Sequence, residues 1–216
     1  MKKTFLMILL AMLLVAAVSF AESVLLDAAW SLLPEEAQLV SQDKDDGLYE
    51  FEFRSDDVDY EAVLNPDGAP LMLKKEYRGV KGGERVQMSL SAMEAEALAV
   101  AGEGAVIDYA LQKADDKRHV WVFFVRRGED AAEIEFNAET GALKEVEWYY
   151  DAAGGLLPLD ILARLTEEKG GVILTEADLE LEDGVLVCSG EATLDGKTYE
   201  FEVRTRDGMI LEWERD

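Results

Sequence analysis

The chain has 216 residues, of which 46 are acidic, 21 are basic and one is a histidine, giving a formal net charge of −25. Such an acidic balance excludes the basic surface that nucleic-acid partners need. It favours cationic partners such as metal ions or a basic protein surface, although we expect most of the acids to be solvated faces of strands. The single cysteine excludes an intramolecular disulfide.

The first 21 residues have the pattern of a secretory signal peptide. Two lysines precede an apolar run from Phe5 to Phe20, and Ser19 and Ala21 place small residues where a signal peptidase cuts. We predict cleavage after Ala21 and a protein that is secreted or held in the cell envelope. Cleavage removes two lysines and no acid, which changes the net charge from −25 to −27. If uncleaved, the segment would anchor the chain to a membrane, but it is short for a bilayer span.

Residues 22–83 are predicted to form a first small domain. Leu25, Ala28, Ala29 and Leu32 lie on one helical face before Pro34. Further along, residues 49–53 alternate aromatic and acidic side chains, which predicts a strand with one apolar face. A turn closes at Gly68, and the glycine-rich stretch 78–83 marks the end of the unit.

Residues 84–155 are predicted to form a second domain. Ser91 to Glu94 has the spacing of a capping box, and Met93, Ala97 and Val100 share a helical face that ends at Gly102. The strand His119–Val125 carries apolar side chains at both parities, so it should be buried on both faces. We therefore expect this unit to be the hub against which the outer two units pack. The alternative is an exposed aromatic patch used for binding.

Residues 156–216 are predicted to form a third domain after the glycine-rich stretch 151–155. Pro158 suits the first turn of a helix, an apolar stripe follows, and Gly170 ends it. Cys188 belongs to an apolar strand, which favours a buried, inert thiol over a nucleophile or a covalent dimer contact. Residues 199–203 again alternate apolar and acidic side chains.

The three units share one plan, a short helix followed by strands that end in a glycine turn. The turn glycines Gly68, Gly141 and Gly208 are 73 and 67 residues apart, which is the size of a small domain and too long for a solenoid repeat. We therefore predict an α+β fold of three tandem small domains, each a short helix packed on an antiparallel β-sheet. The acidic face of each sheet would be left to solvent or to a partner.

The segment from Glu133 to Trp148, with its turn Asn137-Ala138-Glu139-Thr140-Gly141-Ala142-Leu143, resembles the PepSY domain. The first unit lacks the threonine of this turn, and the third has Arg204 in place of the asparagine. The resemblance implies a non-catalytic module, found in secreted and envelope proteins of bacteria and proposed to restrain or modulate peptidases outside the cytoplasm. It implies no catalytic residues.

No residue is nominated as catalytic, cofactor-binding or metal-ligating. His119 is the only histidine, so a zinc site of the His-Glu-x-x-His kind cannot form, and its place beside a charged hairpin turn favours an exposed side chain. The acidic run Asp43–Gly47 does not fit a calcium loop, because the twelfth position would be Phe53. A carboxylate-pair hydrolase is the remaining enzymatic hypothesis, but no spacing singles out a pair.

The sequence thus predicts a binding protein without enzymatic activity or cofactor. Its partner would be a protein, such as an extracellular peptidase that it modulates or inhibits, and not nucleic acid. The alternative is a cell-envelope scaffold that associates with cations or wall polymers. The identity of the partner, the oligomeric state and the residues that make contact stay open.

Overall fold

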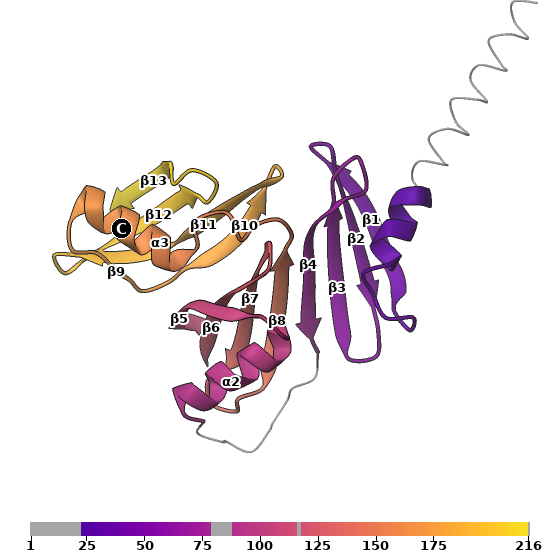
Figure 1. Ribbon diagram of the computed structural model, residues 1–216, viewed down its shortest axis with the longest axis horizontal. Coiled ribbons are helices and arrows are strands. Elements are labelled where there is room, and N and C mark those ends of the chain that lie inside the picture. The colour runs from indigo at the N-terminus through magenta and orange to yellow at the C-terminus, as the bar shows by residue number, and fades with distance from the viewer. Residues whose placement is uncertain (1–22, 79–87, 116–117, 216) are drawn as a thin grey trace, which may run out of the picture.

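The computed structural model describes residues 23–78, 88–115 and 118–215, and this part of the chain is mainly antiparallel β-sheet (Figure 1). One sheet has eight strands in the order β1-β2-β3-β4-β8-β7-β6-β5, and a second sheet contains β9 to β13. The predicted signal peptide and the predicted boundary between residues 83 and 84 lie outside the described residues. None of the described helices has the length and apolar character of a membrane span.

The large sheet consists of β1 (Gln38–Asp45), β2 (Leu48–Arg54), β3 (Val58–Leu64), β4 (Pro70–Tyr77), β5 (Val106–Asp115), β6 (Arg118–Arg127), β7 (Asp130–Asn137) and β8 (Leu143–Tyr149). The smaller sheet consists of β9 (Ile173–Leu174), β10 (Asp178–Glu182), β11 (Val185–Leu194), β12 (Lys197–Arg204) and β13 (Ile210–Arg215). The described helices are α2 (Leu90–Ala101), α3 (Pro158–Lys169) and a segment over residues 23–30.

The predicted fold class, three tandem α+β domains that each pack a helix on a separate sheet, is wrong. Strands β4 and β8 pair antiparallel, from Met72 opposite Tyr149 to Glu76 opposite Glu145, so the first two predicted units share one continuous sheet. Each of these strands would otherwise be an edge with unpaired backbone N–H and C=O groups, and pairing them satisfies both rows. The result is a β-rich fold of two sheets, with the helices as minor elements (Figure 1).

One face of the eight-stranded sheet is covered by α2 and by the helical segment over residues 23–30. Phe51, Phe53, Ile134 and Phe136 belong to the buried cluster on this side, so the predicted alternation of the strands is confirmed. Burying such a side chain stabilises the fold by roughly 1.5–3 kcal/mol. The N-cap of α2 is Ser89, whose hydroxyl accepts from the amide of Ala92 at 3.3 Å.

The predicted capping box at Ser91 is therefore wrong, because Ser89 already has the extended backbone of a cap and Ser91 lies within the helix. Gly102 does end α2, with a φ of 91°. In the third unit, Pro158 begins α3 and Gly170 ends it, as predicted.

The opposite face of β6 packs against the C-terminal part of the chain. Val120, Val122 and Phe124 belong to one buried cluster with α3 and the smaller sheet, whereas Phe123 and Val125 lie in the helix-covered cluster. The prediction that this strand is buried on both faces is thus confirmed. The third unit packs on one face of the strand, whereas the first unit joins the same sheet edge to edge through β4 and β8. Phe123 and Phe124 are fully buried, so the alternative of an exposed patch is excluded for them.

Cys188 of β11 is also fully buried in this second cluster, as predicted. Burial raises the pKa of its thiol well above the usual value, and nearby carboxylates add to the effect. The thiolate, which is the reactive form, is therefore disfavoured.

The three turn glycines share the left-handed backbone, with φ between 68° and 83°. In the first two turns, the side-chain oxygen of Asn65 or Asn137 accepts backbone N–H groups across the turn. In the third, Asp207 accepts from the amide of Met209 at 3.2 Å. Only glycine adopts this backbone without strain, which explains why it recurs at all three positions.

Candidate functional site

Charged side chains form a row across the face of the large sheet that lies opposite the helices. In register, Glu52 of β2 is followed by Glu61 of β3, Lys74 of β4, Glu147 of β8 and Glu133 of β7. Strands of alternating acidic and apolar residues place acids on one face, and pairing of those strands brings the acids together. The row has one lysine for four glutamates. The negative charge of these glutamates is therefore balanced to different degrees along the row.

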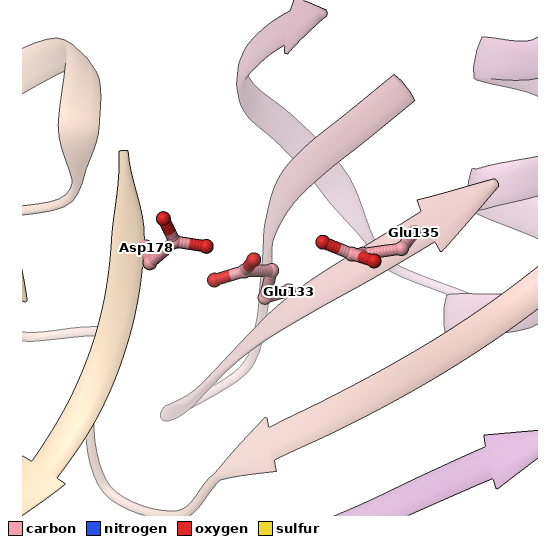
Figure 2. Close-up of side chains that lie close together, drawn as sticks. All are labelled: Glu133, Glu135 and Asp178. Atoms are coloured by element: carbon pink, nitrogen blue, oxygen red, sulfur yellow. The ribbon is translucent and has the colours of Figure 1, made fainter. Parts of the chain in front are cut away.

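At one end of the row lies a buried ion-pair cluster, formed by Glu133 and Glu135 of β7, Asp178 of β10 and Lys113 of β5. Figure 2 shows the three acids pointing toward one another, and their carboxylate oxygens lie within 4.8 Å of one another. Glu133 and Glu135 are only 5% and 7% exposed. The expectation that strand acids face solvent is wrong for these two, because β10 covers them.

Two lysines pair with these acids: Lys144 of β8 contacts Glu135 at 3.1 Å, and Lys113 lies among all three carboxylates. The Nζ of Lys113 lies 2.9 Å from Glu135 and 3.7 Å from Glu133, and it also contacts Asp178. Burial alone would lower the pKa of Lys113, but the three carboxylates outweigh it and raise the pKa. Three carboxylates at this spacing could hold a divalent metal ion, but the ammonium group already occupies their centre. The cluster is therefore a structural network that joins the two sheets.

Glu133 also fixes the backbone of β10. Its Oε2 accepts from the amide of Leu179 at 3.0 Å, and the hydroxyl of Tyr149 donates to the carbonyl of the same residue. Burial raises the pKa of Glu133 well above its usual range, as does repulsion from Asp178, whereas Lys113 acts in the opposite direction. Because both backbone groups of Leu179 are bound, the position of β10 on the large sheet is defined.

Along the middle of the row, beside Glu61, Lys74 and Glu147, lies a groove between β2, β3, β4 and β8 on one side and β10 on the other. Its volume is about 360 Å³. The floor includes Val63, Met72 and Leu179, all less than a tenth exposed. We call it the acidic groove, because among the described residues its lining has one basic side chain, Lys74, beside seven acids: Asp45, Asp46, Glu50, Glu61, Glu147, Glu180 and Asp183.

The charge of Lys74 is directed away from the β2 and β3 side of this groove. Its Nζ lies 3.0 Å from Glu145 and 2.5 Å from Glu147, both on β8. Burial would lower the pKa of Lys74, but these two carboxylates raise it. Within the described residues, neither Glu50 nor Glu61 has a cation within the 4.0 Å of an ion pair.

Glu61 shows the consequence of this imbalance. Burial raises the pKa of its carboxyl group, and the negative charge of Glu50 raises it further, whereas Lys74 only partly offsets the effect. Neighbouring carboxylates without a counter-ion destabilise each other. The β2 and β3 side of the groove is therefore a site of uncompensated negative charge.

Two hairpins also contribute to the lining of the groove. Leu48 lies at the start of β2, and Asp183 lies in the turn between β10 and β11. Leu48 also packs against the apolar cluster that contains α3 and the smaller sheet. The groove thus has an apolar floor and a wall formed by β10.

A further group of acids lies on the open face of the smaller sheet. Glu200 is paired in register with Glu191 and Glu214, and Glu202 is paired with Glu212. We call these five residues the outer acidic face. The nearby Trp213 is half-buried and stacks on Tyr199 with ring centroids 4.9 Å apart, while Trp148 is 7% exposed and carries the Arg127 guanidinium over its ring.

His119 lies exposed on β6, as the sequence predicts. The sequence did not single out Lys113, Glu133 or Glu61, because each sits in an alternating or apolar strand like any solvated charge. The one local signal was Lys113 itself, a lysine in a strand that is otherwise largely uncharged. Which acids are paired depends on contacts between strands far apart in the chain.

No family model matches the chain, and no curated protein matches it. A crystal structure of a protein described as a lipoprotein, from Clostridium difficile 630, is 14% identical over 62% of this chain and 100% of that one, with a TM-score of 0.34. The YpeB C-terminal domain of Bacillus megaterium is 15% identical over 90% and 96%, with a TM-score of 0.33. A BLIP-like protein of Bacteroides fragilis is 16% identical over 55% and 79%, with a TM-score of 0.26. These similarities assign neither a family nor a function to the chain, and the resemblance to PepSY domains stays a prediction.

Proposed function

We propose that this protein is an exported, non-catalytic binding protein that takes a protein partner outside the cytoplasm. The observation that carries the proposal is the acidic groove, a concave site with an apolar floor and with two carboxylates, Glu50 and Glu61, that have no ion-pair partner among the described residues. Concave sites of this kind are the usual places of binding. Export is supported by the pattern of residues 1–21.

The absence of a reactive pair among the described residues supports a non-catalytic role. The only cysteine is buried and the only histidine is exposed on β6, and no hydrogen bond joins them. A carboxylate-pair hydrolase is the least supported hypothesis, because the most closely grouped acids already surround Lys113.

We further propose that the partner is an extracellular peptidase or another envelope protein whose activity is modulated on binding. This finer proposal is supported by the resemblance of the Asn137–Leu143 turn to PepSY domains. A basic loop held in the groove would be withdrawn from its own function, which is a direct route to inhibition.

An envelope scaffold is the second candidate, and it is favoured by the outer acidic face. Directly opposed glutamates such as Glu202 and Glu212 repel each other, and bound cations or basic wall polymers would relieve that repulsion. Co-sedimentation of the protein with purified cell wall, with and without divalent cations, tests this candidate. No co-sedimentation under either condition contradicts it.

The proposed function is tested by affinity capture from the secreted and envelope fractions of the producing cell. The purified protein is the bait, retained proteins are identified by mass spectrometry, and any retained peptidase is assayed with and without the bait. We expect a retained protein that is released as salt rises and a peptidase activity that falls when the bait is added. Retention of wall material alone, or of nothing, contradicts the proposal.

A further inference from the structure

We propose that the occupant of the acidic groove is a basic, partly apolar segment of a protein, whose arginine or lysine side chain enters between Glu50 and Glu61. A neighbouring apolar side chain of the same segment would pack on Val63 and Met72. This inference rests on the proposed function and specifies the chemistry of the partner.

The size of the groove limits what can enter it. At about 360 Å³ it lies near the lower end of the 300–1,000 Å³ range of ligand pockets. Such a volume accepts one or two side chains and not a folded element. The occupant is therefore an exposed loop or an extended segment.

The charge of the groove selects a cation. Glu50 and Glu61 have no ion-pair partner among the described residues, and the one lysine of the groove is held by Glu145 and Glu147. An arginine or lysine inserted here would gain charge-assisted hydrogen bonds without displacing an existing pair. It would also relieve the repulsion that now raises the pKa of Glu61.

The floor of the groove favours an occupant that carries apolar atoms as well as a positive charge. Val63 and Met72 are 8% and 7% exposed, so the floor offers a small apolar surface beside the carboxylates. The methylene stem of arginine or lysine packs well on such a surface, as does an adjacent leucine. A divalent metal ion or a bare ammonium group would use the carboxylates and leave the floor unused.

The test uses two labelled nine-residue peptides and the purified protein. The protein is expressed from the full sequence, including residues 1–21. One peptide alternates arginine and leucine, and the other alternates citrulline and leucine, which keeps the shape and removes the charge. Binding is measured by fluorescence anisotropy at low and physiological salt. We expect the citrulline peptide to bind at least about tenfold more weakly, as the loss of a charge-assisted hydrogen bond requires.

Two double variants of equal charge locate the binding. Glu50→Gln with Glu61→Gln removes two charges from the groove, and Glu200→Gln with Glu214→Gln removes two from the outer acidic face. We expect the groove variant to weaken binding of the arginine peptide at least about tenfold, and the outer variant less than about twofold. Equal losses in both variants would mean general attraction to an acidic protein, which overturns the proposal.

Further outcomes also decide the question. Absence of binding by the arginine peptide overturns the proposal, as does complete displacement of that peptide by millimolar calcium through the same two glutamates. Repeating the affinity capture with the groove variant separates this inference from the proposed function. Loss of the captured partner supports both, whereas a partner that is retained equally by wild type and variant supports the proposed function and overturns the occupant proposed here.

Discussion

The buried ion-pair cluster and the acidic groove lie on the same face of the same sheet, yet they use their acids in opposite ways. In the cluster, Glu133, Glu135 and Asp178 surround Lys113. In the groove, Glu50 and Glu61 face an apolar floor and have no counter-ion among the described residues. The number of acids therefore does not distinguish the structural cluster from the proposed binding site. What distinguishes them is whether the chain supplies its own cation.

The largest expected effect on stability comes from removing Lys113, the central cation of the buried ion-pair cluster. Lys113→Met keeps most of the side-chain volume but leaves Glu133 and Asp178 without an ion-pair partner among the described residues, and Glu135 with Lys144 alone. We expect the free energy of unfolding to fall by about 3–5 kcal/mol, as for other broken buried ion pairs. Urea denaturation at pH 7, followed by tryptophan fluorescence, measures the change.

The matched control is Lys197→Met, which removes an exposed lysine at the start of β12 and should change stability by less than about 0.5 kcal/mol. Equal effects of the two variants would mean that Lys113 does not hold the cluster together.

A smaller loss is expected when one acid of the cluster is neutralised. Asp178→Asn removes one charge from β10, but Lys113 keeps Glu133 and Glu135 as partners. We expect a loss of about 1–3 kcal/mol, the value of a hydrogen bond to a charged group. The exposed Glu182→Gln, on the same strand, is the control. A loss no greater than that of the control would exclude Asp178 as a support of β10.

The pH dependence of stability reports on Glu145 of β8, an acid that pairs with Lys74 beside the acidic groove. Burial raises the pKa of Glu145 from 4.5 to about 7, and the charge of Glu147 adds to this shift. The folded protein therefore binds this proton more tightly than the unfolded chain does. Its contribution to stability is lost as pH rises from about 4.5 to about 7.

Denaturation curves recorded between pH 4.5 and pH 8 should therefore show a shallower fall in stability for Glu145→Gln than for wild type. Glu182→Gln again serves as the control, since it removes a charge that is exposed. An unchanged slope in Glu145→Gln would show that the proton of Glu145 is not bound more tightly in the folded state.

The smallest expected effect is a gain in stability, and it comes from a substitution in the acidic groove. Glu61→Gln removes a carboxylate that repels Glu50 and Glu52. We expect the free energy of unfolding at pH 7 to rise by about 0.2–1 kcal/mol, as for relief of an opposed like-charge pair. A decrease in the free energy of unfolding, measured in the same urea series, would mean that a cation of the protein already balances the charge of Glu61.

Local patterns in the sequence predicted much of the secondary structure. The alternation of residues 49–53 and 199–203, the turn glycines and the doubly apolar strand around Phe123 are all local signals that the structure confirms. The fusion of the first two units into one sheet is not a local signal. It depends on pairing between β4 and β8, which lie about 70 residues apart in the sequence, and neither strand differs in composition from an ordinary edge.

The candidate site was beyond prediction for a related reason. Glu133 and Glu61 both follow the pattern of acids on solvated strand faces, but β10 covers one of them and leaves the other beside a groove. The position of β10 depends on Tyr149, Glu133 and Lys113, which come from three different strands. Burial of a charge is thus set by tertiary contacts, whereas the sequence shows only its place within a strand.

The most direct test of the central claim is a methyl NMR titration of protein labelled at its methionine methyl groups. Met72 lies in the floor of the groove, Met93 is buried under the helix-covered face, and Met209 is exposed in the turn before β13. On addition of the arginine–leucine peptide, we predict that the Met72 signal shifts and that the signals of Met93 and Met209 stay in place. A shift at Met209 without one at Met72 would contradict the claim that the uncompensated acids of the groove form the binding site.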